Sequence, residues 1–352
     1  MNSTLSVDYI IVGQGLAGSS LAVQLIRNGK KIVVIDESSL NHSSRIAAGL
    51  FNPITGQNLV KTWMADTLFD YLHQYYPEVG SLTNQKFFFP MKLYRPFGSV
   101  MEQNDWMGRA EEPSYRNYLE SIHTTSPFKG ELKDDFGGMI LRQCGFLNTS
   151  LYISSVRDYI SRTNLFLEKP FHYDSLKIGS EGVEYENIRA DKIIFCEGHR
   201  NSQNPWFKHL PIRPLKGETI TINSEWQKQV ILNRGVYMVP GSVTGEWRVG
   251  STYQYNVTEP GVTEKGQKEL TEKLNDLISF PFSIVSRDWG IRPTTVDRRP
   301  ILGAHRNFEQ LVIFNGLGTK GVSLAPYFSG VLFRWMIGAG SLNKEVDVTR
   351  YK

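Results

Sequence analysis

Three glycines near the N-terminus have the spacing of a dinucleotide-binding turn. They are Gly13, Gly15 and Gly18 of the segment GQGLAG. In such a turn the first glycine allows a tight bend, the second lets the backbone approach a pyrophosphate, and the third lets helix and strand pack closely. Asp36, further along the chain, is an acid that can accept hydrogen bonds from both hydroxyls of a ribose. Together these residues predict a dinucleotide site.

The flanking segments predict the elements that position these residues. Residues 8–12 (DYIIV) form a short, apolar, β-branched run that is typical of a buried strand. A helix with one apolar face is expected over residues 16–27, and Asn28-Gly29 has the composition of its C-cap. Residues 31–35 (KIVVI) predict a second strand that ends at Asp36. The helix would then present its free N–H groups and the positive end of its dipole to the phosphates.

The segment after Asp36 differs from the further βα units that usually follow in NAD enzymes. A polar loop at 37–44 (ESSLNHSS) leads into residues 45–56 (RIAAGLFNPITG), which are rich in small residues and turn formers. Small side chains would let the backbone lie flat against a planar ring. This favours a flavin dinucleotide over a nicotinamide dinucleotide.

Composition excludes several other classes of protein. A hydrophobic content of 40% and a charged content of 21% are ordinary for a soluble globular chain. The formal net charge of +4 over 352 residues permits an anionic ligand, but nucleic acid is not favoured. The two cysteines, Cys144 and Cys196, suit a reducing cytoplasm, and without a Cys/His cluster we expect no metal site.

Neither end of the chain predicts membrane insertion. The N-terminal segment lacks the basic and apolar regions of a signal peptide. The apolar segment 321–338 contains Pro326 and Arg334, so it predicts a buried helix rather than a membrane span. We therefore expect a cytoplasmic protein; the sequence does not indicate its oligomeric state.

Several separated motifs resemble those of the D-amino-acid oxidase family, which includes glycine oxidase and sarcosine oxidase. They occur near both ends of the chain and in its middle. They are SSRIAAGLFNP (43–53), RPLKGE (213–218), VYMVPG (236–241), WRVGSTY (247–253), GIRPTTVDRRPILG (290–303) and NGLGTKGVSLAP (315–326).

This resemblance implies an α/β fold: a Rossmann-like FAD-binding domain with an inserted α+β substrate domain that contains an antiparallel sheet. We expect the FAD-binding domain to comprise residues 1–80, 145–210 and 285–352, and the substrate domain 81–144 and 211–284. Runs such as GETITIN, GVYMVPG and EWRVGSTYQY are bounded by glycine, as expected for strands of that sheet.

The resemblance also implies a set of FAD-binding residues. FAD would be non-covalent, because no cysteine occurs in the C-terminal part where some family members tether it. The expected cofactor-binding residues are Gly13, Gly15, Leu16, Ala17, Gly18, Asp36, Glu37, Ser43, Ser44, Arg45, Ala47, Ala48, Gly49, Leu50, Gly198, Gly316, Gly318, Thr319, Lys320 and Gly321.

Three residues are expected at the reaction centre. Arg292 occupies the family position that clamps a substrate carboxylate, for which a planar guanidinium is suited. Tyr237 falls where the family places a hydroxyl against the same carboxylate. Lys320 would add positive charge near the flavin N1–C2=O edge or assist oxygen reduction. Arg298 and Arg299 are better candidates for structural ion pairs.

The activity implied is oxidation of the C–N bond of a small amino acid or secondary amine, with hydride transfer to flavin N5. The sequence does not distinguish an oxidase from a dehydrogenase. One alternative is oxidation of a carboxymethylamino-type group on modified tRNA, since the flavin domain of a bifunctional tRNA-modifying enzyme has similar C-terminal motifs. Another is a non-catalytic flavin-binding partner protein. That reading rests on Glu197, where the family has a small residue or Thr, and on residues 61–143, which match no motif.

Overall fold

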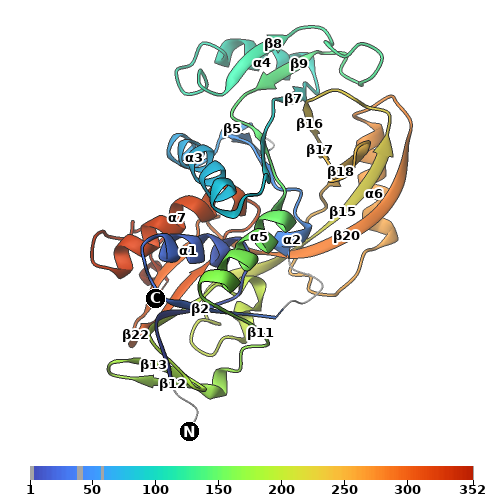
Figure 1. The fold of residues 1–352 in the computed structure, drawn as a ribbon. Helices are drawn as coiled ribbons and strands as arrows, with labels where there is room; N and C mark the ends of the chain where they lie inside the picture. Colours follow the sequence, from blue (N-terminus) through green and yellow to red (C-terminus); the bar gives the residue numbers. More distant parts are fainter. Residues whose placement is uncertain (1–3, 38–42, 57–58, 352) are drawn as a thin grey trace.

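An eight-stranded sheet forms the lower part of the molecule in the computed structural model, which describes residues 4–37, 43–56 and 59–351 (Figure 1). Five of its strands are parallel, in the spatial order β11, β2, β1, β14, β22. Their bounds are Leu165–Glu168, Ile32–Asp36, Leu5–Val12, Ile188–Phe195 and Phe308–Asn315. Antiparallel strands β12 (Leu176–Gly179), β13 (Gly182–Tyr185) and β21 (Ile301–His305) complete the sheet.

The parallel strands all end at one edge of this sheet, and the predicted cofactor residues lie in the loops beyond that edge. Gly13 follows β1, Glu37 follows β2, Gly198 lies beyond β14, and Gly316 follows β22. In open α/β sheets, ligands bind outside the carboxyl ends of the strands. The predicted Rossmann-like α/β architecture is therefore confirmed, and it gathers residues from both ends of the chain.

Four long helices lie on one side of this sheet, and the second of them packs on other helices rather than on these strands (Figure 1). They are α1 (Leu16–Arg27), α3 (Ala65–Thr83), α5 (Thr149–Thr163) and α7 (Gly321–Met336). Helix α1 packs against both α5 and α7, which is why its residues from Leu16 to Leu25 are all buried rather than one face alone. It ends at the predicted C-cap, where Asn28 is followed by Gly29 with a φ of 72°.

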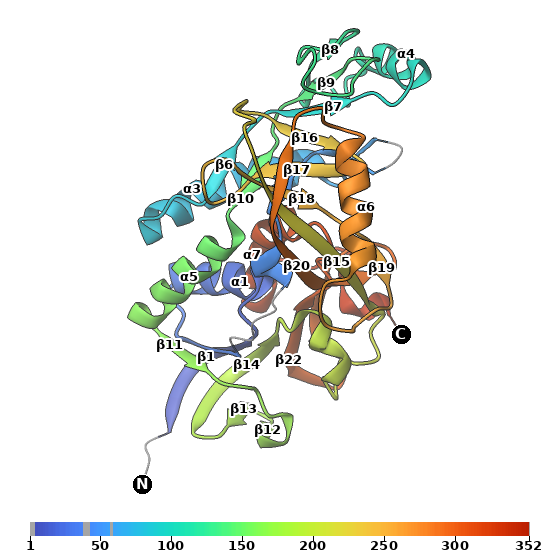
Figure 2. The ribbon, with the colours of Figure 1, turned by 90° about the vertical axis from the view of Figure 1, so that its right-hand side faces the viewer.

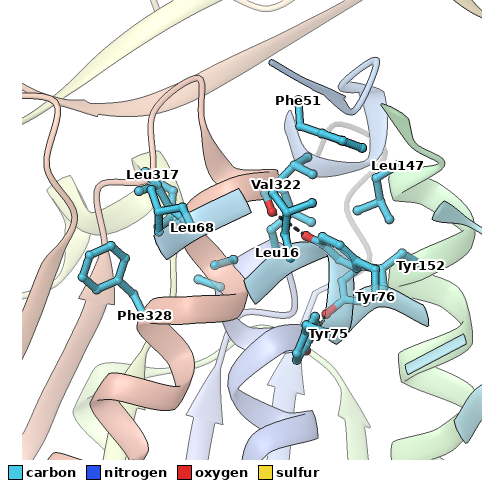
Figure 3. Close-up of a cluster of buried hydrophobic side chains, with 14 of the residues drawn as sticks. Leu16, Phe51, Leu68, Tyr75, Tyr76, Leu147, Tyr152, Leu317, Val322 and Phe328 are labelled. Atoms are coloured by element: carbon cyan, nitrogen blue, oxygen red, sulfur yellow. Dashed lines mark hydrogen bonds between the residues drawn. The ribbon is translucent and has the colours of Figure 1, made fainter. Parts of the chain in front are cut away.

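The core under the cofactor edge is an aromatic and aliphatic cluster (Figure 3). The Tyr76 hydroxyl on α3 donates a hydrogen bond of 2.8 Å to the carbonyl of Val322, in the first turn of α7. Leu16, Leu317 and Val322 belong to this core and also line the large cavity described below. The start of α1 and the start of α7 are thus held by the same packing.

A nine-stranded, mostly antiparallel sheet forms the upper part (Figure 2). Its main order is β19, β15, β18, β17, β16, β7, β9, β8, and β20 pairs with β15. The bounds are β7 Leu93–Pro96, β8 Leu119–His123, β9 Gly138–Leu141, β15 Ile212–Ser224, β16 Ile231–Arg234, β17 Val236–Pro240, β18 Glu246–Gly250, β19 Gln254–Tyr255 and β20 Phe282–Thr295. The three predicted glycine-bounded strands are β15, β17 and the pair β18 and β19.

The remaining elements are shorter. Helix α6 (Glu264–Asn275) covers one face of the nine-stranded sheet, and α4 (Val100–Arg109) lies near its β8–β9 end (Figure 2). The others are α2 Ser43–Ile46, β3 Leu50–Phe51, β4 Ile54–Thr55, β5 Val60–Lys61, β6 Phe88–Pro90 and β10 Gly145–Leu147.

Residues 61–143, which match no motif, divide between the two parts. Helix α3 packs one face against α5 and α7, where Tyr75 and Tyr76 are buried, while Asp70 and Glu78 on its other face are exposed. Strands β7, β8 and β9 instead extend the nine-stranded sheet. The domain boundaries proposed above stay a prediction. Among the described residues, no helix is long and apolar enough to cross a membrane.

Candidate active site

A cavity of about 2170 Å³ lies between the carboxyl edge of the parallel sheet and one face of the nine-stranded sheet. Ligand pockets usually measure about 300–1,000 Å³, so this space can hold a large cofactor together with a substrate. All the predicted site residues line it except Gly18 and Arg45. The described residues contain no group of three or more His, Cys, Asp or Glu side chains that would hold a metal ion.

Two glycines of the turn at the start of α1 have no space for a Cβ atom. Gly13 has a φ of 95°, and a Cβ there would lie 2.5 Å from the carbonyl oxygen of Cys196. A Cβ on Gly18 would overlap the carbonyl oxygen of Gly13, so Gly18 sets the close packing of helix and strand instead of lining the cavity. The Leu16 N–H donates to the Ser44 hydroxyl at 3.3 Å, which joins α2 to the helix N-terminus.

Gln14 and Arg157 both hold Asp36 beside this turn. Its Oδ1 accepts a hydrogen bond of 3.0 Å from the backbone N–H of Gln14, and its Oδ2 lies 3.4 Å from Nη2 of Arg157 on α5. Arg157 also donates to the Gln14 side chain at 2.9 Å. The carboxylate is thus fixed at the cavity wall next to the glycine turn. Its binding of a ribose stays a prediction.

Glu197, the departure from the family pattern, lies in the cavity wall and has its own hydrogen-bond partners. Tyr173 donates to one carboxylate oxygen at 2.5 Å, and Asn204 donates to the other at 2.8 Å. Burial raises the pKa of Glu197 to about 7, although both hydrogen bonds and Arg200 oppose the rise. The Tyr173 and Asn204 side chains therefore accommodate the acid at a position where a small residue was expected.

This raised pKa predicts a pH-dependent stability. The folded protein holds a proton on Glu197 that the unfolded chain releases near its ordinary pKa, so the stabilising contribution is complete below about pH 4.5 and is lost as pH rises through about 7. Melting temperatures of the wild type and Glu197→Gln, measured from pH 5 to 8, should therefore diverge in favour of the variant as pH rises. Parallel melting curves would contradict this account.

Lys320 lies at the N-terminal end of α7, which borders the cavity. Its Nζ is 3.3 Å from the Thr62 hydroxyl. Burial, with the positive charges of Arg298 and Arg299, lowers the pKa of Lys320 to about 8. The neighbouring Gly318 backbone N–H donates to the Pro293 carbonyl at 2.9 Å, so this N–H is already used within the chain.

Arg292, on β20, lies over β15 in the substrate-side wall of the cavity. Its Nη2 donates to the Ser251 hydroxyl at 2.8 Å, and the Tyr253 ring centroid is 5.3 Å from the guanidinium carbon. Its Nη1 is buried and has no hydrogen-bond partner among the described residues. A Cβ on Gly217 would overlap the guanidinium. The guanidinium is thus held from one side and has one nitrogen left to bind an anion.

Tyr237, on β17, lies beside Arg292 on the same sheet. Its hydroxyl projects over Gly250, where a Cβ would lie 2.5 Å from the phenol oxygen. Burial raises the pKa of Tyr237 to about 12, while Arg292 acts in the opposite direction. Tyr237 therefore remains a neutral hydrogen-bond donor at physiological pH.

The two other arginines of this segment have different surroundings. The Arg299 guanidinium lies 4.0 Å from the Trp63 ring centroid, and its Nε lies 3.5 Å from Glu345, so it forms the predicted structural ion pair. Arg298 is exposed. Sequence reasoning missed Ser251 and Gly217, although both stand inside motifs that had been identified (GSTY and RPLKGE).

The residues present fit FAD. The glycine turn excludes Cβ atoms at the end of β1, Asp36 is fixed beside it, and the cavity continues to the start of α7 and to Arg292. A dinucleotide would extend along these features in that order. Cys144 and Cys196 are both free, and neither lies in the C-terminal part of the chain where some family members tether FAD. Non-covalent binding of FAD therefore stays the prediction.

Comparisons with known proteins agree with this geometry. Glycine oxidase from Geobacillus kaustophilus superimposes with a TM-score of 0.81 at 18% identity, covering 99% of this chain and 98% of that one. Iminodiacetate oxidase from Chelativorans sp. gives 0.77 at 20% identity and 98% coverage of both chains. The tRNA 5-methylaminomethyl-2-thiouridine biosynthesis bifunctional protein MnmC of Campylobacter concisus is 22% identical over 85% of this chain, which spans only 47% of that protein.

The family model described as "FAD dependent oxidoreductase" matches residues 8–335, nearly the whole chain. This match includes the glycine turn, the nine-stranded sheet and the start of α7. The chain is therefore a member of the DAO family of FAD-dependent oxidoreductases.

Proposed function

We propose that the protein oxidises the C–N bond of a small amino acid or secondary amine whose carboxylate binds to Arg292. The observation that carries the proposal is the buried Arg292 Nη1, which has no partner among the described residues although the guanidinium lies in the cavity wall. A buried N–H group of a cation without a partner is costly, and a substrate carboxylate would satisfy it.

The chain's own residues would bind and orient the substrate. Arg292 would hold one carboxylate oxygen while Ser251 holds the guanidinium in place, and the neutral Tyr237 hydroxyl would donate to the same carboxylate. Two fixed donors on one carboxylate determine where the adjacent carbon and amine lie, which is a contribution of proximity and not of acid–base chemistry. Bound FAD would supply the acceptor for the hydride, which carries the electron pair away from the substrate carbon. The imine formed would hydrolyse in water.

The experiment that tests this function is an anaerobic absorbance titration of the holoprotein with D-amino acids, glycine, sarcosine, proline and N-substituted glycines. We expect at least one of them to bleach the flavin. Readmitting air would then distinguish an oxidase, whose flavin reoxidises at once, from a dehydrogenase. A flavin that none of these compounds bleaches would contradict the proposal.

Lys320 is expected to contribute a positive charge that is lost near pH 8. Because burial lowers its pKa to about 8, the turnover rate at saturating substrate should fall above that pH as Nζ deprotonates. Lys320→Arg should move this fall to higher pH, and Lys320→Met should remove it and lower the rate. Rates measured from pH 6 to 10 for the three proteins test this. Identical profiles would show that Lys320 has no part in turnover.

A second candidate is oxidation of a carboxymethylamino-type group on modified tRNA. The similarity over 85% of the chain to the Campylobacter bifunctional protein favours it, and such a group also presents a carboxylate to Arg292. If small amines fail to bleach the flavin but tRNA bearing this group succeeds, and binding weakens steeply with salt, this candidate replaces the first.

A further inference from the structure

The face of the nine-stranded sheet that lines the cavity continues well beyond Tyr237. Side chains alternate between the two faces of a strand. On β7, Tyr94 packs in the cluster beneath α6, whereas Leu93 packs in the core on the opposite face. Arg95 therefore shares the face of Leu93, and it lines the cavity. A second arginine thus stands in the same wall as Arg292.

Strand register places Arg95 in a single row of cavity-lining residues. Thr219 lies opposite Gly250, Gly250 opposite Tyr237, and Tyr237 opposite Asn233. Arg95, on the neighbouring strand β7, continues the row: its Nη1 donates to the Asn233 carbonyl at 3.1 Å. All five residues line the cavity, so the row runs across neighbouring strands from Thr219, two residues along β15 from Gly217, to Arg95.

The distance between Arg292 and Arg95 determines how long a molecule must be to bind both. The Arg292 guanidinium lies over Gly217 on β15, and Arg95 bonds to β16, with β18 and β17 between. Three strand spacings amount to about 14 Å across the sheet, and the offset of two residues along β15 from Gly217 to Thr219 makes the separation somewhat longer. That separation leaves room for a molecule with an acidic group at each end.

The charge of Arg95 is only partly balanced inside the protein. Within the described residues its carboxylate contact is Glu102 at 3.4 Å, and the other oxygen of Glu102 accepts a hydrogen bond of 2.6 Å from the Gly98 backbone N–H. The Arg95 Nε is buried and has no partner among the described residues. Lys273, which lines the same end of the cavity, adds a second cation that pairs with Glu269 at 2.6 Å.

We infer that this end of the cavity, formed by Arg95, Asn233, Gly235 and Lys273, is an anion-binding subsite for the distal end of the substrate. The inference deepens the function proposed above and rests on it. The substrate would be an amino acid whose amine carries a substituent ending in a carboxylate or another oxyanion such as a phosphonate. Glycine, sarcosine and proline would leave the distal subsite empty.

The test uses unreactive ligands, so that it does not depend on turnover. The holoprotein is titrated with monocarboxylates and with α,ω-dicarboxylates from malonate to sebacate, and the shift of the flavin absorbance is followed. We expect a dicarboxylate of intermediate length to bind about tenfold more tightly than a monocarboxylate of equal length, the size of one modest charge-assisted interaction. A phosphonocarboxylate of that length shows whether the distal group is a carboxylate or a phosphoryl oxyanion.

Three variants separate the subsite from a structural role. Arg95→Met should abolish the advantage of the dicarboxylate while leaving monocarboxylate affinity unchanged, and Arg95→Lys should retain part of it if the methionine variant does not fold. Glu102→Gln should tighten dicarboxylate binding, because it removes the competing carboxylate; loss of a purely structural ion pair would not do so. Lys268→Met, which removes a charge from an exposed position of α6, is the control.

Two results would overturn the subsite. One is equal affinity for mono- and dicarboxylates at every length. The other is an advantage of the dicarboxylate that persists in Arg95→Met. Failure of the proposed function gives a different result: no amino acid bleaches the flavin, however tightly the dicarboxylates bind.

Discussion

Replacing Arg292 with methionine is expected to reduce kcat/KM for a carboxylate-bearing amine by a factor of roughly 30 to several thousand, because removing one partner of a buried charge pair costs about 2–5 kcal/mol. Nη1 has no partner among the described residues, so most of the loss should be substrate binding, seen as a rise in KM. The flavin spectrum should be retained, since Arg292 lies in the substrate-side sheet.

Two comparisons make this result specific to the carboxylate. Arg292→Lys should recover only part of the activity, because an ammonium keeps the charge without the planar fork. Arg299→Met removes an arginine of the same segment that is paired with Glu345, and it should leave KM near the wild-type value. An equal rise in KM in both methionine variants would contradict the assignment of Arg292 to the substrate.

The second large effect is expected from Gly217→Ala, which adds a single methyl group. A Cβ at this position would overlap the Arg292 guanidinium, the flexible end of a side chain, so the chain should fold with the guanidinium displaced. Displacement of a binding group by about 1 Å can cost on the order of 100-fold in rate. We expect a loss of kcat/KM approaching that of Arg292→Met, with little change in melting temperature.

Gly108→Ala on α4 is the matched control, because a Cβ there meets nothing within 4 Å. It should leave kcat/KM unchanged and raise stability slightly, by about 0.5–1 kcal/mol, because alanine replaces glycine within a helix. If Gly217→Ala keeps full activity, the position of the guanidinium is unimportant, and the binding geometry proposed here is wrong.

Local sequence patterns predicted the cofactor edge well, for a physical reason. The glycine turn, α1 and β2 are consecutive in the chain, so the spacing of Gly13, Gly15, Gly18 and Asp36 determines their relative positions almost directly. Gly29 at the helix end is similarly local, because a positive φ next to Asn28 is a property of a few residues.

The substrate wall could not be assembled in this way. Gly217, Ser251 and Arg292 meet only through the register of β15, β18 and β20, and register depends on pairings between distant segments. Arg95 was missed because its strand β7 lies in a stretch without motifs. Only the pairing of that strand with β16 brings it into the same wall.

Helix α3 shows a related difficulty. Its residues predict an amphipathic helix, but the helix α7 that covers its apolar face comes from the far end of the chain. The hydroxyls then find partners inside the core: Tyr76 donates to the Val322 carbonyl, and Tyr75 lies 3.1 Å from the Tyr152 hydroxyl. A single segment does not reveal which of its faces a distant helix will cover.

The most direct test of the central claim compares an amino acid that the protein oxidises with the amide of the same amino acid, in which a neutral group replaces the carboxylate. Anaerobic flavin bleaching is measured for both compounds in the wild type and in Arg292→Met. We predict that the wild type is bleached far faster by the acid, and that the variant treats the two compounds alike because the carboxylate no longer has its partner. Equal bleaching by acid and amide in the wild type would contradict the claim that Arg292 binds the substrate carboxylate.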